Sequence, residues 1–188
     1  MKNIAVYCGA AMGNDKIYQQ ATLELADYLV EHNLGLVYGG GSVGLMGLLA
    51  KRVLQSGGQV QGVITRELVQ RGAALVELAD LQVVKDMSER KQRMLELSDG
   101  CIALPGGPGT LEEISQSFSW TRLGDYTKPC VLYNVGGYYD SLKTMFQQMV
   151  AKDFLTAREL DKLLFSDSLT EIFDFIENYL PPQIRTYN

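Results

Sequence analysis

The segment Pro105-Gly-Gly-Pro-Gly-Thr-Leu-Glu-Glu113 contains the residues of this chain that are best suited to binding and chemistry. It follows a short apolar run, Gly100–Leu104, which we interpret as a buried strand. It leads into Leu111–Ile114, which we interpret as the first turn of a helix. Glycines let a backbone approach a ligand closely, and the free amides and the dipole of a helix start favour an anion. We therefore expect a phosphate to bind along Gly106–Thr110.

Two adjacent carboxylates, Glu112 and Glu113, stand directly behind this turn, where ordinary phosphate loops have none. A carboxylate pair at this place suggests chemistry as well as binding. A structural alternative is a capping box with Thr110 as the N-cap and Glu113 three residues later, worth about 1 kcal/mol. The capping box and a catalytic role for Glu113 are compatible with each other.

A second glycine loop has the spacing Gly39-x-Gly41-x-x-Gly44 between an expected strand and an expected helix. By this pattern Gly41 and Gly44 are predicted to help hold a phosphate or nucleotide. The alternative is a tight turn whose glycines allow close packing of helix against strand. NAD is not favoured, because Glu67 lies too far along the chain to be the acidic residue that binds its ribose.

The basic segment Met87-Ser-Glu-Arg-Lys-Gln-Arg-Met94 follows another expected strand. On a helix Arg90 is a neighbour of both Arg93 and Met94, which places Arg90 toward the core side. A solvated basic face is the ordinary interpretation of such a run. The functional interpretation places Arg90 beside the glycine loops, where its guanidinium can bind a phosphate through two hydrogen bonds.

Composition excludes several classes of function. The chain has 188 residues and a net charge of −5, which disfavours a nucleic-acid partner. No segment is long and apolar enough to span a bilayer, and the apolar run at the start is too short for a signal peptide. His32 is the single histidine, so neither a histidine-rich metal site nor a Ser-His-Asp triad is expected, and we predict no metal. The three cysteines favour free thiols in a reducing, cytoplasmic location: Cys8, Cys101 and Cys130.

Strand-like and helix-like segments alternate along the whole chain, which predicts an α/β protein with a parallel sheet. We expect a single Rossmann-like domain over residues 1–188, with a doubly wound parallel sheet of about seven strands and helices on both faces. The predicted strands are 4–8, 34–38, 59–64, 81–85, 101–104, 129–133 and 163–165. The predicted helices are 16–31, 45–55, 87–97, 110–123, 139–152 and 169–180. Residues 65–80 are expected to be irregular.

Three motifs in this order and at this spacing resemble the LOG family: Gly39–Gly47, Met87-x-Glu-Arg-Lys91 and Pro105-Gly-Gly-x-Gly-Thr-x-x-Glu113. Its members are cytokinin riboside 5′-monophosphate phosphoribohydrolases, often labelled lysine decarboxylase-like. The resemblance runs from about Ile4 to the last helix. It implies a homodimer, no organic cofactor, and a role in cytokinin biosynthesis. The implied reaction is hydrolysis of a nucleotide such as AMP, or of an N6-substituted relative, to free base and ribose 5-phosphate.

The resemblance also implies roles for individual residues. Arg90 and Glu113 take the catalytic positions, and the substrate-binding positions are Lys91, Gly107, Gly109, Thr110 and Ser119. The chain departs from the family pattern at three places, Gly72, Ser88 and Gln116, where members carry glutamate, histidine and glutamate. These departures suit a second hypothesis, a carrier or sensor that binds a nucleotide or cofactor without turnover. A pyridoxal-phosphate decarboxylase is disfavoured, since we find no lysine in the setting that a Schiff base requires.

Overall fold

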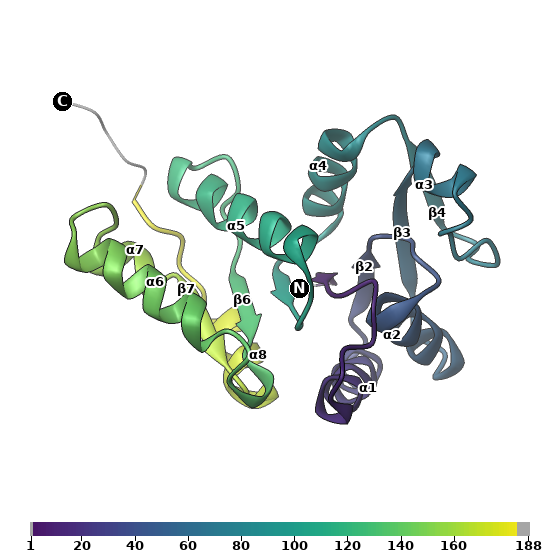
Figure 1. Cartoon of the computed structure of the whole chain (residues 1–188), viewed down its shortest axis with the longest axis horizontal. Helices are drawn as coiled ribbons and strands as arrows, with labels where there is room; N and C mark the ends of the chain where they lie inside the picture. Colours follow the sequence, from purple (N-terminus) through teal and green to yellow (C-terminus); the bar gives the residue numbers. More distant parts are fainter. Residues whose placement is uncertain (1, 184–188) are drawn as a thin grey trace.

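The computed structural model of the chain describes residues 2–183, and its core is one seven-stranded parallel sheet. The strand order is β4-β3-β2-β1-β5-β6-β7 (Figure 1). The predicted α/β fold with a doubly wound parallel sheet is confirmed. The strands are β1 (Asn3–Tyr7), β2 (Gly35–Tyr38), β3 (Val60–Thr65), β4 (Leu81–Val84), β5 (Cys101–Ala103), β6 (Cys130–Tyr133) and β7 (Leu163–Ser166).

Helices connect successive strands, and several begin at a side-chain cap. Asp15 caps α1 through the Ile17 amide, and Asp86 caps α4 through the amides of Ser88 and Glu89. These caps explain why both helices begin where the sequence predicts. The helices are α1 (Lys16–Glu31), α2 (Gly44–Gln55), α3 (Arg66–Gln70), α4 (Met87–Leu97), α5 (Pro108–Leu123), the 3-10 turn η1 (Val135–Gly137), α6 (Asp140–Ala151), α7 (Ala157–Leu160) and α8 (Leu169–Glu177).

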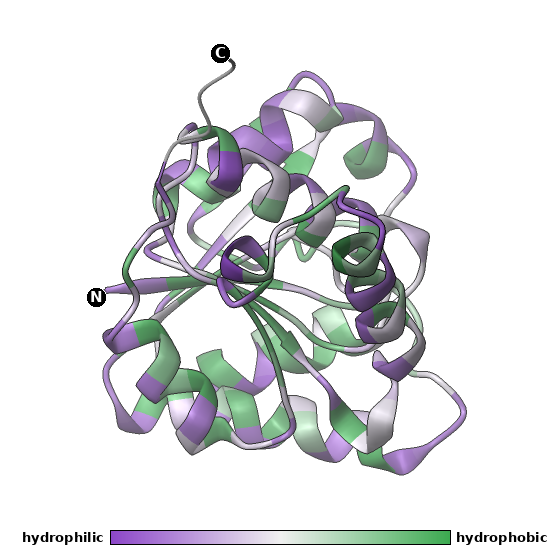
Figure 2. Ribbon diagram, turned by 90° about the vertical axis from the view of Figure 1, so that its left-hand side faces the viewer, coloured by the Kyte–Doolittle hydropathy of each residue, from purple (hydrophilic) through white to green (hydrophobic). Residues whose placement is uncertain are grey.

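The sheet is covered on both faces, and its central strands are accordingly mostly apolar (Figure 2). Helices α1, α2 and α8 cover one face, where Leu25, Leu49 and Ile172 pack among the buried side chains. Helices α4, α5 and α6 cover the other face with a second cluster that includes Met94 and Phe118. Figure 1 shows these two layers on opposite sides of the strands.

The strand order reverses at β1, and this reversal brings three loops together. The chain moves outward from β1 through β2, β3 and β4, then returns to place β5 on the other side of β1. The loops after β1 and β5 are joined by a hydrogen bond from the Gly9 amide to the Pro105 carbonyl, 3.1 Å long. The Met46 amide at the start of α2 donates to the Gly9 carbonyl at 3.3 Å. Both glycine loops therefore meet at the switch point, where open α/β sheets bind ligands.

Two short helices were not predicted, because four or five residues are too few to show a helical period. Within the stretch expected to be irregular, α3 follows Thr65, whose hydroxyl accepts from the Leu68 amide. Near the C-terminus, α7 begins at a capping box formed by Thr156 and Glu159. The last helix ends at Glu177 rather than at residue 180.

Main-chain hydrogen bonds join the stretch after α3 to the loop after β2. The Ser42 amide donates to the Ala73 carbonyl at 2.8 Å, and the Leu75 amide donates to the Gly40 carbonyl at 2.9 Å. An isolated antiparallel bridge pairs Gly41 with Ala74. Among the helices described here, none has both the length and the apolarity that a bilayer crossing requires.

We predict that Gly44→Ala destabilises the protein far more than Gly57→Ala. Both glycines have a positive φ, +61° and +80°, which strains any other residue by about 1–2 kcal/mol. A Cβ on Gly44 would lie 2.2 Å from the Ala10 carbonyl carbon, whereas a Cβ on Gly57 would meet open space. Urea unfolding should show a loss of about 1–2 kcal/mol for Gly57→Ala and on the order of 3 kcal/mol or more for Gly44→Ala. Equal losses would contradict this account of the turn.

Candidate active site

Arg90 lies in α4 with its guanidinium buried against the sheet. Its Nε donates to the Val63 carbonyl and its Nη2 donates to the Gly39 carbonyl, both at 2.9 Å. Val63 lies in β3 and Gly39 directly follows β2, so Arg90 connects the carboxyl ends of two neighbouring strands. A Cβ on Gly39 would lie 1.8 Å from Nη2, so only glycine leaves room for the guanidinium. The expected turn of Arg90 toward the glycine loops is therefore present, but Nε and Nη2 both donate to main-chain carbonyls, and Nη1 donates weakly to the Met87 sulfur at 3.6 Å.

The remaining nitrogen of Arg90 faces Glu113 in α5. Nη1 lies 3.9 Å from Glu113 Oε1, and the two side chains are only 8% and 10% exposed. That separation is an ion pair without a direct hydrogen bond. The hydrogen bonds within residues 2–183 include none that the Glu113 carboxylate accepts. The carboxylate thus keeps the capacity to bind a water or a substrate atom.

Burial raises the pKa of Glu113 from 4.5 to about 7. Burial is the largest influence because it disfavours the charged carboxylate, and the neighbouring Glu112 raises the pKa further. Arg90 and Lys91 oppose the rise with their positive charges. A carboxyl group whose pKa lies near neutrality can either accept or release a proton under physiological conditions.

Other buried groups support the turn of α5 that carries Glu113. Ser117 Oγ donates to the Glu113 carbonyl at 2.8 Å and lies 3.2 Å from the Tyr7 hydroxyl at the end of β1. Burial raises the pKa of Tyr7, and both burial and the Glu113 carboxylate raise the pKa of the Cys8 thiol. Tyr7 and Ser117 were not predicted as site residues. The sequence indicates them only weakly. Tyr7 is a tyrosine at the end of a strand, and Ser117 is a serine one helical turn after a glutamate.

The predicted phosphate loop leads into α5 earlier than expected. The helix begins at Pro108, with Gly107 as its N-cap and no side-chain cap among the described residues. Thr110 is therefore the third helical residue, and the structural alternative of a capping box between Thr110 and Glu113 is absent. Proline at the first position needs no amide partner, which explains the early start. The amides at this helix start remain available for an anion.

The glycines of this loop have two different surroundings. A Cβ on Gly106 would lie 2.2 Å from Thr110 Oγ1, so Gly106 is needed for packing of the loop. Gly107 and Gly109 are exposed, and a Cβ on either would meet nothing within 4 Å. Open space over uncapped amides is the geometry that a phosphate group requires.

The other glycine loop, Gly39–Gly47, is explained by packing. The Leu45 and Met46 amides at the start of α2 donate to the Ala11 and Gly9 carbonyls, which occupy the place of an anion. Gly44 lies against the Ala10 backbone, and Gly41 is buried. The geometry favours the alternative of a tight packing turn, and substrate binding by Gly41 and Gly44 stays a prediction without structural support.

The remaining predicted site residues lie on α4 and α5. Lys91 Nζ is 2.5 Å from Glu112 Oε1, with Lys91 11% exposed and Glu112 58% exposed. This pair lies next to the Arg90–Glu113 pair and ties the same two helices together. Ser119 is exposed and lies six residues after Glu113, about 9 Å along the helix and on another side of it. Within one chain, Ser119 is not brought to the Arg90–Glu113 pair.

The three departures from the family pattern have different settings. Gly72 lies in the turn after α3 with a φ of +74° and open space around it. Ser88 is exposed on the first turn of α4. The Gln116 side-chain oxygen is buried without a hydrogen-bond partner among residues 2–183.

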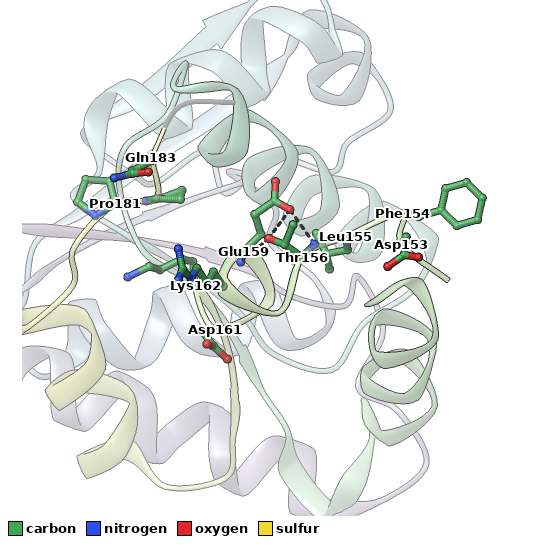
Figure 3. A pocket seen from close by; sticks show the side chains of 11 residues that line it. Asp153, Phe154, Leu155, Thr156, Glu159, Asp161, Lys162, Pro181 and Gln183 are labelled. Carbon is green, nitrogen blue, oxygen red and sulfur yellow. Dashed lines mark hydrogen bonds between the residues drawn. The ribbon is translucent and has the colours of Figure 1, made fainter. Parts of the chain in front are cut away.

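Two surface cavities formed by residues 2–183 lie away from this pair. One of about 620 Å³ lies between the α6–α7 connection, α7 and residues 181–183, and Arg90 and Glu113 do not line it (Figure 3). Its walls carry both charge signs, including Lys162 and Asp161. Another, of about 500 Å³, lies between α4 and the end of α5 and is lined in part by Trp120. Among the described residues, no three His, Cys, Asp or Glu side chains form a group suited to a metal ion.

The family described as "Possible lysine decarboxylase" matches residues 46–176. The chain is 41% identical to the cytokinin riboside 5′-monophosphate phosphoribohydrolase LOG1 of Arabidopsis thaliana, over 96% of this chain and 84% of that protein. It is also 41% identical to the probable cytokinin riboside 5′-monophosphate phosphoribohydrolase LOGL6 of Oryza sativa subsp. japonica, over 96% and 72% of the two chains.

A solved structure with a similar fold is the molybdenum cofactor carrier protein of Chlamydomonas reinhardtii. Its TM-score is 0.68 at 18% identity, and the match covers 94% of this chain and 96% of that chain. At this level of identity the likeness concerns the fold alone.

We predict that Glu113 makes the stability of the protein depend on pH. Because the folded state raises its pKa from 4.5 to about 7, folding favours the protonated form, and stability decreases as pH rises through that range. Relative to Glu113→Gln, the wild type should lose about 3 kcal/mol of unfolding free energy between pH 5 and pH 8. Urea unfolding at several pH values measures this difference.

The control for this measurement is Glu112→Gln, which removes a half-exposed carboxylate from the same turn. It should retain most of the pH dependence. If the unfolding free energy of Glu113→Gln changes between pH 5 and pH 8 as that of the wild type does, the Glu113 carboxyl group does not have a raised pKa.

Proposed function

Because this chain belongs to the LOG family of cytokinin riboside 5′-monophosphate phosphoribohydrolases, we propose that it hydrolyses the N-glycosidic bond of a purine nucleoside 5′-monophosphate. The products are the free base and ribose 5-phosphate. The observation that supports this most directly is the buried Arg90–Glu113 pair beside the uncapped start of α5. The proposal needs no metal and no organic cofactor.

In this proposal the 5′-phosphate binds at the start of α5. The amides of Gly107, Gly109 and Thr110 provide donors, and the helix dipole adds a favourable potential for a phosphate. Lys91, 11% exposed and paired with Glu112, adds positive charge nearby. The nucleotide is then anchored at its phosphate, with its ribose extending toward the second turn of α5, where Glu113 lies.

Glu113 acts on the bond between the sugar and the base. As the C1′–N bond breaks, its electron pair leaves with the base and the ribose ring becomes positively charged, which a fixed carboxylate stabilises. Glu113 accepts a proton from the attacking water, whose oxygen bonds to C1′. The departing base takes up a proton from solvent water, and Glu113 returns its proton to solvent after the reaction. A pKa of about 7 suits this proton transfer near neutral pH.

In this proposal Arg90 acts on Glu113, whereas the sequence led us to expect it to bind the phosphate. Two of its nitrogens donate to main-chain carbonyls, so the guanidinium is held in place before any substrate arrives. Its third nitrogen faces Glu113 and lowers the pKa of that carboxyl, which burial alone would raise further. Arg90 thus keeps a fraction of Glu113 ionised as the base.

Exposed apolar side chains at the carboxyl edge of the sheet favour a base with an apolar substituent. Met12, Val43 and Val76 lie in loops after β1, β2 and α3, and Met87 and Leu111 lie in the first turns of α4 and α5. The substituent of an N6-substituted adenine of the cytokinin type would cover some of these apolar side chains, whereas AMP would leave them exposed. Cytokinin riboside 5′-monophosphates are therefore the proposed substrates, with AMP as the alternative, and cytokinin biosynthesis is the proposed role.

A cytoplasmic homodimer completes the proposal. The last turns of α5 carry the exposed Leu123 and the half-buried Trp120, which lines the cavity between α4 and α5, and these offer an apolar face for a second copy. Ser119 on the same helix is then placed to reach the site of the partner subunit rather than its own. The free, buried cysteines Cys8, Cys101 and Cys130 agree with a reducing compartment.

The carrier or sensor hypothesis has weaker support. The sequence likeness to phosphoribohydrolases is 41%, whereas the likeness to the cofactor carrier is 18% and concerns the fold alone. Glu113 also argues against simple binding, because a carboxylate near a bound phosphate weakens the binding.

We predict that Glu113→Gln abolishes release of the free base while the protein stays folded. The amide cannot take a proton from water or balance the charge on the ribose, so kcat should fall by at least 100-fold. Chromatography of reactions with AMP and with N6-prenylated AMP measures the free base, and the wild type should prefer the prenylated substrate. Glu112→Gln is the matched control, and it should retain most activity. Full activity of Glu113→Gln, or no hydrolysis of either nucleotide by the wild type, would overturn the proposal.

We further predict that Gly109→Ala folds well but binds phosphate poorly. Alanine in a helix is favoured over glycine by about 0.5–1 kcal/mol, and its methyl group would enter the open space proposed for the phosphate. Calorimetry should show weaker binding of ribose 5-phosphate by 10-fold or more, together with an unchanged or raised melting temperature. Gly106→Ala should instead lower the melting temperature, since its methyl group collides with Thr110. Normal binding by Gly109→Ala would place the phosphate elsewhere.

A further inference from the structure

Two consecutive tyrosines after β6 bind main-chain carbonyls of the loop after β5. The Tyr139 hydroxyl donates to the Leu104 carbonyl at 2.7 Å, and the Tyr138 hydroxyl donates to the Gly106 carbonyl at 2.5 Å. Gly106 belongs to the loop that leads into α5. We propose that Tyr138 is a positioning residue that orients the Gly106–Gly107 peptide for binding the substrate phosphate. This inference rests on the proposed function, since it concerns the phosphate site of that reaction.

The direction of the peptide follows from its geometry. The described residues contain no cis peptide bond, and in a trans peptide the carbonyl and the amide point in opposite directions. With the Gly106 carbonyl directed at Tyr138, the Gly107 amide points away from Tyr138. Gly107 is the N-cap of α5 and has open space where its Cβ would be. This amide is one of the free donors of the helix start.

Among residues 2–183, the Tyr138 hydroxyl donates the one hydrogen bond that the Gly106 carbonyl accepts. Both residues that flank it are glycines, which rotate about their backbone bonds at little steric cost. Rotation of the peptide would exchange the Gly107 amide for the Gly106 carbonyl, and an oxygen directed at a phosphate repels it. One hydrogen bond to the carbonyl therefore selects the orientation that attracts the phosphate.

Tyr138 itself is held by a rigid turn. The Asn134 side chain accepts from the Tyr139 amide at 2.6 Å and donates to Asp140 at 2.7 Å. Gly136 and Gly137 adopt a positive φ, +58° and +74°, which gives the turn its tight course. The chain after β6 thus places both tyrosines before any ligand binds.

The ring of Tyr138 is also fixed by its neighbours. It makes edge-to-face contacts with Tyr18, at 5.7 Å between ring centroids, and with Tyr139, at 4.9 Å. Tyr138 is nevertheless 43% exposed, whereas Tyr139 is 5% exposed. A half-exposed tyrosine contributes little to the core, so loss of its hydroxyl should leave the fold intact.

Tyr138→Phe tests the proposal because it removes the hydroxyl and keeps the ring. Loss of one hydrogen bond that orients the peptide should weaken the binding of ribose 5-phosphate by about 5- to 10-fold, measured by calorimetry. With the nucleotide substrate, KM should rise by a similar factor and kcat should change less than twofold. Hydrolysis of the corresponding nucleoside, which has no phosphate, should be unaffected. The melting temperature should stay within about 2 °C of the wild type.

The matched control is Tyr18→Phe, whose ring contacts Tyr138 and whose hydroxyl makes no hydrogen bond among residues 2–183. It should bind ribose 5-phosphate as the wild type does. If Tyr138→Phe binds it equally well, or if both variants weaken binding to the same extent, the proposed role of the hydroxyl is wrong while the proposed function stands. If the wild type binds no ribose 5-phosphate, the proposed function fails and this inference with it.

Discussion

The contact on which the rest of the site depends is the one between the Arg90 guanidinium and the carbonyls of Val63 and Gly39. Burying a cation away from water costs several kcal/mol unless its N–H groups form hydrogen bonds. Here the two main-chain carbonyls accept those hydrogen bonds. The arrangement fixes the third nitrogen, and with it the charge that faces Glu113. Both members of the ion pair are therefore in place in the free protein, so little reorganisation is needed when a substrate arrives.

The topology of the sheet supplies the partners for this contact. Because the chain reverses direction across the sheet after β4, the right-handed crossovers from β4 to β5 and from β5 to β6 place α4 and α5 on the same face. Arg90 and Glu113 are 23 positions apart in sequence, yet they meet across these two helices. The uncapped start of α5 lies at the same switch point, so the anion site and the carboxylate share one helix, less than two turns apart.

Much of this arrangement was predictable from sequence, and the failures have physical causes. The strands and the longer helices follow from their apolar periods, and Arg90 and Glu113 were identified by the motifs that contain them. The contacts of Arg90 could not be predicted in the same way. No periodicity in the sequence reveals that two of its nitrogens donate to the carbonyls of Val63 and Gly39. The start of α5 was misplaced because Thr110 and Glu113 have the spacing of a capping box, while Pro108 starts the helix without one. Tyr138 was missed because its partner is a main-chain oxygen 32 residues earlier.

The link between the loop after β2 and the stretch after α3 has a consequence for how this scaffold changes over evolution. Ser42 and Leu75 make the link through their amides, to the carbonyls of Ala73 and Gly40. Because these hydrogen bonds join main-chain atoms, they do not depend on which side chains the stretch after α3 carries. Residues such as Val76 can be exchanged freely, while the glycines around Arg90 cannot. Side chains of this stretch can thus change in evolution without disturbing the Arg90–Glu113 pair.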